Sequence, residues 1–170
     1  MEEFLEAVES ALASWNWYAA LTLSLALPDI AGWVDDPTQG SAERYQRWFD
    51  EFVGLSYEGY LGPEHVRELF LSGADCYALR CSFLHEGRDD ISHQRARDAL
   101  TRFQFIAPRR GFRIHMNIVG TKLQLQVDIF CHDICNGVRR WLAQIPADDI
   151  ERLQRLSELL RIQINGMIAF

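Results

Sequence analysis

The sequence has little of several features that mark common classes of enzyme. Lys122 is the only lysine among its 17 basic residues, and it follows no glycine-rich loop of the kind that holds nucleotide phosphates. The four cysteines form no CxxC pair, and no serine lies in a G-x-S-x-G motif. We therefore expect neither a P-loop nucleotide hydrolase nor a serine hydrolase of the nucleophile-elbow type.

Long hydrophobic runs are also missing. The longest apolar stretch, 21–27, is broken by Thr22 and Ser24 and falls far short of the roughly 20 residues that a membrane span needs. The first residues, MEEFLEAVES, are acidic, whereas a signal peptide begins with basic residues. The cysteines lie in apolar helical patterns, where a free thiol behaves as a small hydrophobe. These features predict a cytoplasmic protein without a membrane segment.

An excess of positive charge is absent as well. Asp and Glu number 24 against 17 Lys and Arg, which gives a formal net charge of −7. This balance argues against a general DNA or RNA coat protein, although it leaves room for a small basic phosphate site. The 170 residues are 48% hydrophobic and 24% charged. That composition predicts one globular domain, 1–170, with a substantial core.

Apolar residues that recur every three or four positions predict a mainly α protein, a bundle of about five to six helices. Pro28 is expected to end or kink the first helix. The expected helices span 2–27, about 42–53, 63–71, 72–87, about 121–145 and about 148–162.

A small β appendage is expected between these helices. Two short strands, 103–107 and 112–119, flank the turn 108–111 and predict a β-hairpin inserted at 103–119. The tail 161–170 is open to two interpretations. Asn165-Gly166 suits a hairpin turn, and Gly166 equally suits the end of a helix.

The helix 72–87 has the clearest boundaries. Ser72 with Asp75 three residues later is an acidic variant of the capping box, and Gly87 suits the C-terminal cap. This helix carries Arg80 and His85. The bare Arg-x4-His pattern carries no weight, because composition alone predicts about 0.5 matches. Three pairs have this spacing: Arg80/His85, Arg88/His93 and Arg110/His115. Only the first lies on a capped helix.

The stretch ALRCSFLHEG, which contains Arg80 and His85, resembles the signature of the HEPN superfamily. The resemblance implies an all-helical homodimer in which two copies of the motif share a cleft. In active members it implies cleavage of RNA without a metal or other cofactor, often in toxin–antitoxin or defence systems with an antitoxin or regulatory protein partner. Arg80 and His85 would then be catalytic, with Cys81, Ser82 and Glu86 in support.

Other members of this superfamily have lost catalysis and serve as binding or regulatory modules. The residue after the arginine is commonly Asn or Asp in the family, and here it is Cys81. This departure supports the non-catalytic alternative, although Ser82 could partly substitute as a polar neighbour.

The chemistry of the pair suits RNA cleavage. A histidine exchanges protons near neutral pH, and an arginine binds phosphate oxygens and offsets charge in the transition state. Five residues on an ideal helix turn about 500°, so Arg80 and His85 diverge by roughly 140°. They meet only if Arg80 reaches along the axis, if the helix frays, or if a second chain completes the site. In a purely structural alternative, Arg80 pairs with Asp29 or Asp50, and His85 caps its helix.

Two further stretches carry candidate chemistry. His132 and Asp133 resemble the adjacent pair of metal-dependent HD phosphohydrolases, but no spacing selects the further ligands, and buried cysteines beside an exposed His-Asp pair are the favoured interpretation. Arg109, Arg110 and Arg113 form a basic turn with aromatic neighbours. They are candidates for binding an RNA backbone, and a solvated loop tip is the favoured alternative.

Overall fold

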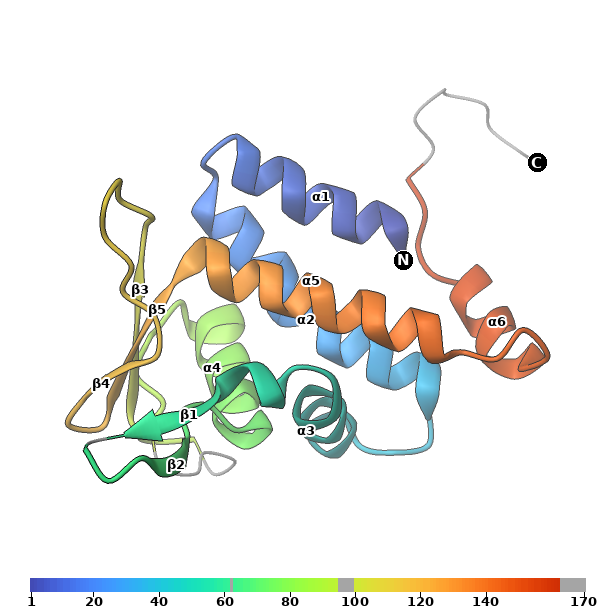
Figure 1. Ribbon diagram of the computed structural model, residues 1–170. Coiled ribbons are helices and arrows are strands. Elements are labelled where there is room, and N and C mark those ends of the chain that lie inside the picture. The colour runs from blue at the N-terminus through green and yellow to red at the C-terminus, as the bar shows by residue number, and fades with distance from the viewer. Residues whose placement is uncertain (62, 95–99, 163–170) are drawn as a thin grey trace.

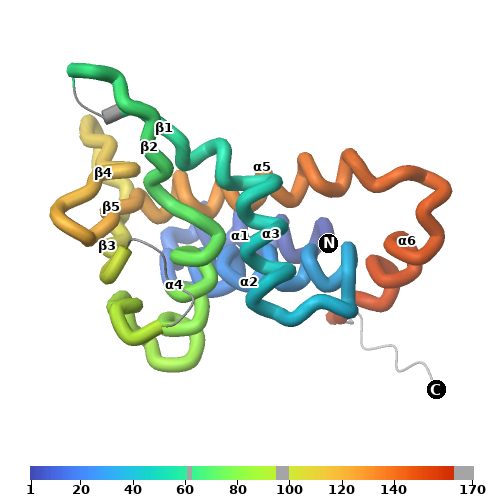
Figure 2. The backbone as a smooth tube through the Cα atoms, turned by 90° about the horizontal axis from the view of Figure 1, so that it is seen from below, coloured from blue at the N-terminus to red at the C-terminus, as the bar shows by residue number. Residues whose placement is uncertain are grey.

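The computed structural model describes residues 1–61, 63–94 and 100–162 as a mainly helical protein with two small sheets (Figure 1). The helices are α1 (Glu2–Ala13), α2 (Trp17–Asp35), α3 (Ser41–Phe52), α4 (Gly73–Glu86), α5 (Val127–Gln144) and α6 (Ile150–Ser157), with the 3-10 turn η1 (Gly54–Tyr57). The strands are β1 (Glu58–Leu61), β2 (Val66–Leu69), β3 (Arg102–Ile106), β4 (Asn117–Val119) and β5 (Lys122–Gln126). The sheets lie at one end of the helical layer and α6 at the other (Figure 2).

The single helix expected over 2–27 is in fact two helices. Trp15 has φ 61°, which is the left-handed conformation, and its N–H donates to the Leu12 carbonyl. The N–H of Asn16 donates to the Ala11 carbonyl. These two bonds make a Schellman motif, which ends α1 and usually has glycine where Trp15 stands. Asn16 then caps α2 by accepting from the N–H of Ala19 at 3.2 Å.

Pro28 was expected to end or kink its helix, and it does not end it, because α2 continues to Asp35. Proline removes one hydrogen bond from a helix interior, the bond to the carbonyl of Ser24. Packing offsets this loss, since Pro28 is buried and α2 packs against α1, α3 and α5 at the centre of the molecule. Tertiary contacts of this kind routinely outweigh local propensity.

The prediction for the helix 72–87 is confirmed. Ser72 accepts from the N–H of Asp75 at 3.1 Å, and Gly87 ends α4 with φ 68°. Gly73 allows α4 to approach α3 closely, because a Cβ there would lie 2.5 Å from the Gln46 carbonyl oxygen. The Gly73 N–H also donates to Asp50 at 2.7 Å.

The hairpin expected at 103–119 is not formed. β3 pairs in parallel with β5, and β4 pairs antiparallel with β5, so the order is β3-β5-β4. Within 112–119 only Asn117–Val119 is a strand. The cause is the segment expected to begin the long helix at about 121. Leu123 and Leu125 alternate with polar residues there, which makes 122–126 a half-buried strand and delays α5 to Val127.

The prediction of a helix over 63–71 is also wrong. Val66–Leu69 instead form β2, which pairs antiparallel with β1, from Glu58 opposite Leu69 to Leu61 opposite Val66. His65 has φ 49°, a left-handed conformation that turns the chain back before β2. Four residues are too few to read a period reliably, which is why the sequence favoured a helix there.

The last helix is shorter than expected. α6 begins after Asp149, whose carboxylate accepts from the N–H of Arg152 at 3.0 Å, and it ends at Ser157. The two interpretations of the tail 161–170 depend on Asn165 and Gly166, which lie outside the described part. No helix among the described residues is long and apolar enough to cross a membrane.

Candidate functional site

Asp29, on α2, gathers polar side chains from two other helices. It accepts from Arg80 Nη2 of α4 at 3.2 Å and from Arg44 Nε of α3 at 2.8 Å. The hydroxyl of Ser41 donates to both carboxylate oxygens at 3.1 Å. The side chains of Asp29 and Arg80 are only 15% and 20% exposed, so water screens their charges weakly. The pairing of Arg80 with Asp29, expected in the structural alternative, is therefore confirmed.

Arg80 and His85 also meet within one chain. Arg80 Nη1 lies 3.3 Å from His85 Nε2. Because a guanidinium only donates, a hydrogen bond between them requires Nε2 of His85 to be the acceptor. The long side chain of Arg80 reaches along α4 and bridges the angle of about 140° between the two positions. His85 itself is exposed, so solvent reaches it.

The guanidinium of Arg80 is held from two sides. One terminal nitrogen binds Asp29 and the other faces His85, while its buried Nε has no hydrogen-bond partner among the described residues. A bidentate phosphate contact would have to use the remaining N–H bonds or displace one of these partners. The pair can therefore exchange protons at His85 and offer positive charge beside it.

The supporting residues differ in their positions. Cys81 is half-buried on the outer side of α4, and its contact with Tyr77 raises the pKa of that phenol beyond the effect of burial. Ser82 is buried and donates to the Asp90 carbonyl at 2.8 Å. Glu86 is exposed and pairs with His93 at 3.1 Å. Ser82 thus holds the chain after α4, and the expectation that it could act as a polar neighbour of Arg80 is wrong.

The three arginines of the expected turn do not join this site. Arg109, Arg110 and Arg113 are exposed on the loop between β3 and β4, and Arg109 lies 5.5 Å above the ring of Phe112. Ala107, at the start of this loop, lines a cavity with Trp17 and Tyr18. Tyr18 and Asp29 are 11 residues apart on α2, which is about 16 Å along the axis. The loop therefore belongs to another part of the surface.

The side chains of His132 and Asp133 lie in different surroundings. His132 is exposed and lines a shallow hollow with Glu9 and Asp128. Asp133 accepts from the hydroxyl of Tyr57 at 3.3 Å. No group of three metal-ligating side chains occurs in the part of the chain that the structure describes. Burial raises the pKa of Cys131 to about 12 and that of Cys135 to about 11, so both are thiols near neutral pH.

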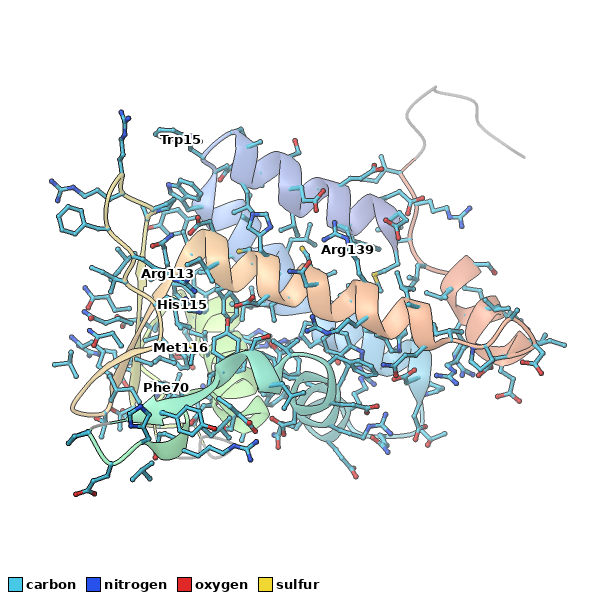
Figure 3. The ribbon with its side chains drawn as sticks, in the orientation of Figure 1. Trp15, Phe70, Arg113, His115, Met116 and Arg139 are labelled. Carbon is cyan, nitrogen blue, oxygen red and sulfur yellow. The ribbon has the colours of Figure 1, made fainter. Side chains whose placement is uncertain are left out.

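A buried cluster around His115 was not expected from the sequence (Figure 3). His115 Nδ1 accepts from the N–H of Gln126 at 3.3 Å, and Nε2 lies 3.7 Å from Asp133, too far for a hydrogen bond. Burial, aided by the charge of Arg113, lowers the pKa of His115 to about 4, so the ring is neutral at pH 7. Burial raises the pKa of Asp133. Burial therefore outweighs the attraction between the two, and they form a polar contact rather than an ion pair.

The residues that sequence reasoning missed come from distant segments. Ser41 and Arg44 join Asp29, and Tyr57 joins His115, across helix and loop contacts that no local pattern reveals. No family model, curated protein or solved structure gives a significant match to the chain.

Proposed function

We propose that this chain is a HEPN-like, metal-independent endoribonuclease of a toxin or defence-type system. Its catalytic residues would be Arg80 and His85, and it would act as a homodimer in the cytoplasm with an antitoxin or regulatory protein as partner. The observation that carries the proposal is the contact of Arg80 Nη1 with Nε2 of an exposed His85. A base and a cation that touch one another at the surface are the two groups that RNA cleavage requires.

The reaction can be written with all atoms balanced. When Arg80 Nη1 turns from His85 to the phosphate, the lone pair of His85 Nε2 is freed. It takes the proton of a ribose 2′-OH, and the 2′ oxygen attacks the adjacent phosphorus. The bond from phosphorus to the 5′ oxygen breaks, which leaves a 2′,3′-cyclic phosphate. The 5′ oxygen receives a proton from His85 of the second protomer, which enters the reaction in its protonated form, so one histidine gains the proton that the other loses. Arg80 stabilises the extra negative charge on the phosphate during the attack. The chain's own residues supply every group, and Asp29 fixes the guanidinium from behind.

The outer face of α4 supports the dimer. Apolar and small residues continue on this face at helical spacing and are only half-buried: Ala74, Tyr77, Cys81 and Leu84. They flank Arg80 and His85 on the same helix. A second copy packed against this stripe would bury it and bring two His85 side chains into one cleft. The four free thiols suit the reducing cytoplasm.

One observation favours a second candidate, a non-catalytic HEPN-like dimeric binding or regulatory module. Arg80 is only 20% exposed, and both of its terminal nitrogens already have partners. An arginine held in this way can serve to join α2 to α4 without touching a substrate. In that case the dimer would form and no RNA would be cleaved.

The test is RNA cleavage in EDTA by the wild type, Arg80→Ala and His85→Ala. The chain supplies a matched control, because Arg88 and His93 have the same spacing outside the helix. We expect Arg80→Ala and His85→Ala to lose 100-fold or more, on the order of what one transition-state group contributes. Arg88→Ala and His93→Ala should cleave as the wild type does. Equal cleavage by all four variants, or activity that EDTA abolishes, would exclude the proposal.

A further inference from the structure

Charge is segregated in this acidic protein. Residues 100–127 contain no Asp or Glu and five basic residues, so the rest of the chain carries 12 basic residues against all 24 acidic ones. The described part of this stretch is the three-stranded sheet and its loops. The five basic residues are Arg102, Arg109, Arg110, Arg113 and Lys122. The three-stranded sheet and its loops are therefore a positive surface on a chain of net charge −7, although Arg102 pairs with Asp90 at 3.2 Å.

Exposed aromatic rings lie beside this positive surface. Trp15 is 76% exposed and Tyr18 is 78% exposed, and the rings of Trp15 and Trp17 stack with centroids 6.3 Å apart. No charged residue occurs from 10 to 28. Figure 3 shows Trp15 at the turn between α1 and α2, at the end of the molecule where the β3–β4 loop projects. We call Trp15 and Tyr18 the aromatic platform; Phe112, on that loop, is a further exposed ring, at 66%.

The backbone at Trp15 gives independent support. Its left-handed conformation at the end of α1 is one that glycine adopts freely and a bulky residue rarely adopts. An exposed tryptophan held there brings the fold no burial that would offset this strain. Strain of this kind is concentrated where a side chain has a function.

Two adjoining cavities continue from the platform. The first, of about 230 Å³, lies between Trp17 and Tyr18 of α2 and Phe105 and Ala107 of the β3 side. The second, of about 440 Å³, shares Tyr18 and Phe105 with the first and extends to Gly87. Both are open to solvent and lined largely by apolar atoms. Together they form a groove along which flat rings can lie.

We propose that this surface binds single-stranded nucleic acid. Bases stack on Trp15 and Tyr18, and phosphates contact Arg109 and Arg110 on the β3–β4 loop, whose first residue, Ala107, lines a cavity with Tyr18. Aromatic rings interleaved with arginines are the arrangement by which proteins bind single strands without reading their sequence. Charge complementarity alone would also suit an acidic peptide. The exposed rings favour nucleic acid, since every base has a face that stacks on them.

This surface is separate from Arg80 and His85. Phe83 lines the groove and lies two residues before His85, about 200° around α4. His85 therefore faces the other side of the helix. The binding proposal does not rest on cleavage, and the two can fail independently.

The test is binding of fluorescein-labelled single strands of about a dozen nucleotides to the full chain, followed by polarisation. Oligothymidine is the main probe, because DNA lacks the 2′-OH and stays intact. Oligouridine of the same length distinguishes RNA from DNA, and a duplex of the same length tests the preference for single strands. Trp15→Gly is the decisive variant, since glycine suits the backbone while the ring is removed. We expect affinity to fall about tenfold while the melting temperature does not fall.

Arg109→Ser together with Arg110→Ser should weaken binding and make the salt dependence shallower, by about 0.7 in the logarithmic slope for each phosphate that the protein no longer neutralises. Tyr60→Ala and Arg67→Ser, on the β1–β2 hairpin, are matched controls for an exposed ring and an exposed arginine, and they should bind as the wild type does. The proposal is overturned if Trp15→Gly binds as tightly as the wild type. Tighter binding of labelled polyglutamate than of either strand would likewise overturn it in favour of an acidic peptide.

Discussion

Arg80 and His85 touch, although they sit on one regular helix at positions that diverge by about 140°. The contact of 3.3 Å between Nη1 and Nε2 exists because Asp29 holds the other terminal nitrogen of the same guanidinium at 3.2 Å. A carboxylate on α2 thus directs an arginine of α4 along its own helix. The pair needs no second chain to form, and a second protomer would add a second pair.

Asp29→Ala should lower the free energy of unfolding by about 2 kcal/mol, because three donors lose a charged acceptor at a site with little water. Urea denaturation measures this change. Asp89→Ala is the control, since that side chain is 60% exposed and should change stability by about 0.5 kcal/mol or less. An unchanged urea midpoint for Asp29→Ala would contradict the anchoring role.

Arg80→Lys should separate the structural role from the chemical one. Lysine keeps the positive charge near Asp29 but lacks the planar fork that reaches Asp29 and His85 together. We expect stability within about 1 kcal/mol of the wild type and RNA cleavage reduced about 100-fold. Rapid cleavage by Arg80→Lys would mean that the fork is not needed.

Trp15→Gly should raise the free energy of unfolding by about 1 kcal/mol, because it relieves a left-handed conformation that costs a side-chain-bearing residue roughly 1–2 kcal/mol. Thermal unfolding followed by circular dichroism measures the change. Gly87→Ala provides the opposite case, since φ is 68° there and nothing lies within 4 Å of an added Cβ. It should lower stability by about 1 kcal/mol. Destabilisation by Trp15→Gly would show that the ring has a structural role.

Stability should fall as the pH drops from about 6.5 towards 4. The pKa of His115 is lowered from 6.5 to about 4 in the folded protein, so the unfolded chain binds the proton first. The stability that comes from neutral His115 is therefore fully present above pH 6.5 and is lost as the pH falls below that value. The loss in the free energy of unfolding is on the order of 2–3 kcal/mol at pH 4. The raised pKa of Asp133 has the opposite effect, because the folded protein binds that proton first, so stability gains from Asp133 as the pH falls towards 3.8.

His115→Asn should make this pH dependence shallower, because asparagine keeps an acceptor near the position of Nδ1 but does not titrate. Urea midpoints measured at pH 4.5 and pH 7 provide the comparison. If the urea midpoint changes by the same amount between pH 4.5 and pH 7 in the wild type and in His115→Asn, the pH dependence comes from other groups.

Local signals predict part of the fold. Ser72, Asp75 and Gly87 define α4 correctly, because caps and their hydrogen bonds lie within a few residues of one another. The break at Trp15 could not be foreseen, since tryptophan stands where a Schellman motif usually has glycine. The strand 122–126 was expected to be helical because its two leucines also fit the start of the long helical pattern.

Only part of the candidate site can likewise be predicted from the sequence. Arg80 and His85 stand out because they share a helix, and charge alone suggests Asp29 as a partner for Arg80. The roles of Ser41 and Arg44 depend on how α3 crosses α2, which no local pattern encodes. The sequence places His115 beside the loop arginines, whereas its contacts with Gln126 and Tyr57 bury it.

The most direct measurement is the cleavage of a single-stranded RNA in EDTA, with the ends of the products identified. We predict that the wild type yields 2′,3′-cyclic phosphate ends, that the same RNA with 2′-O-methyl groups stays intact, and that His85→Ala leaves both uncut. Cleavage of the methylated RNA, or cleavage by His85→Ala at the rate of the wild type, would contradict the central claim that Arg80 and His85 carry the reaction.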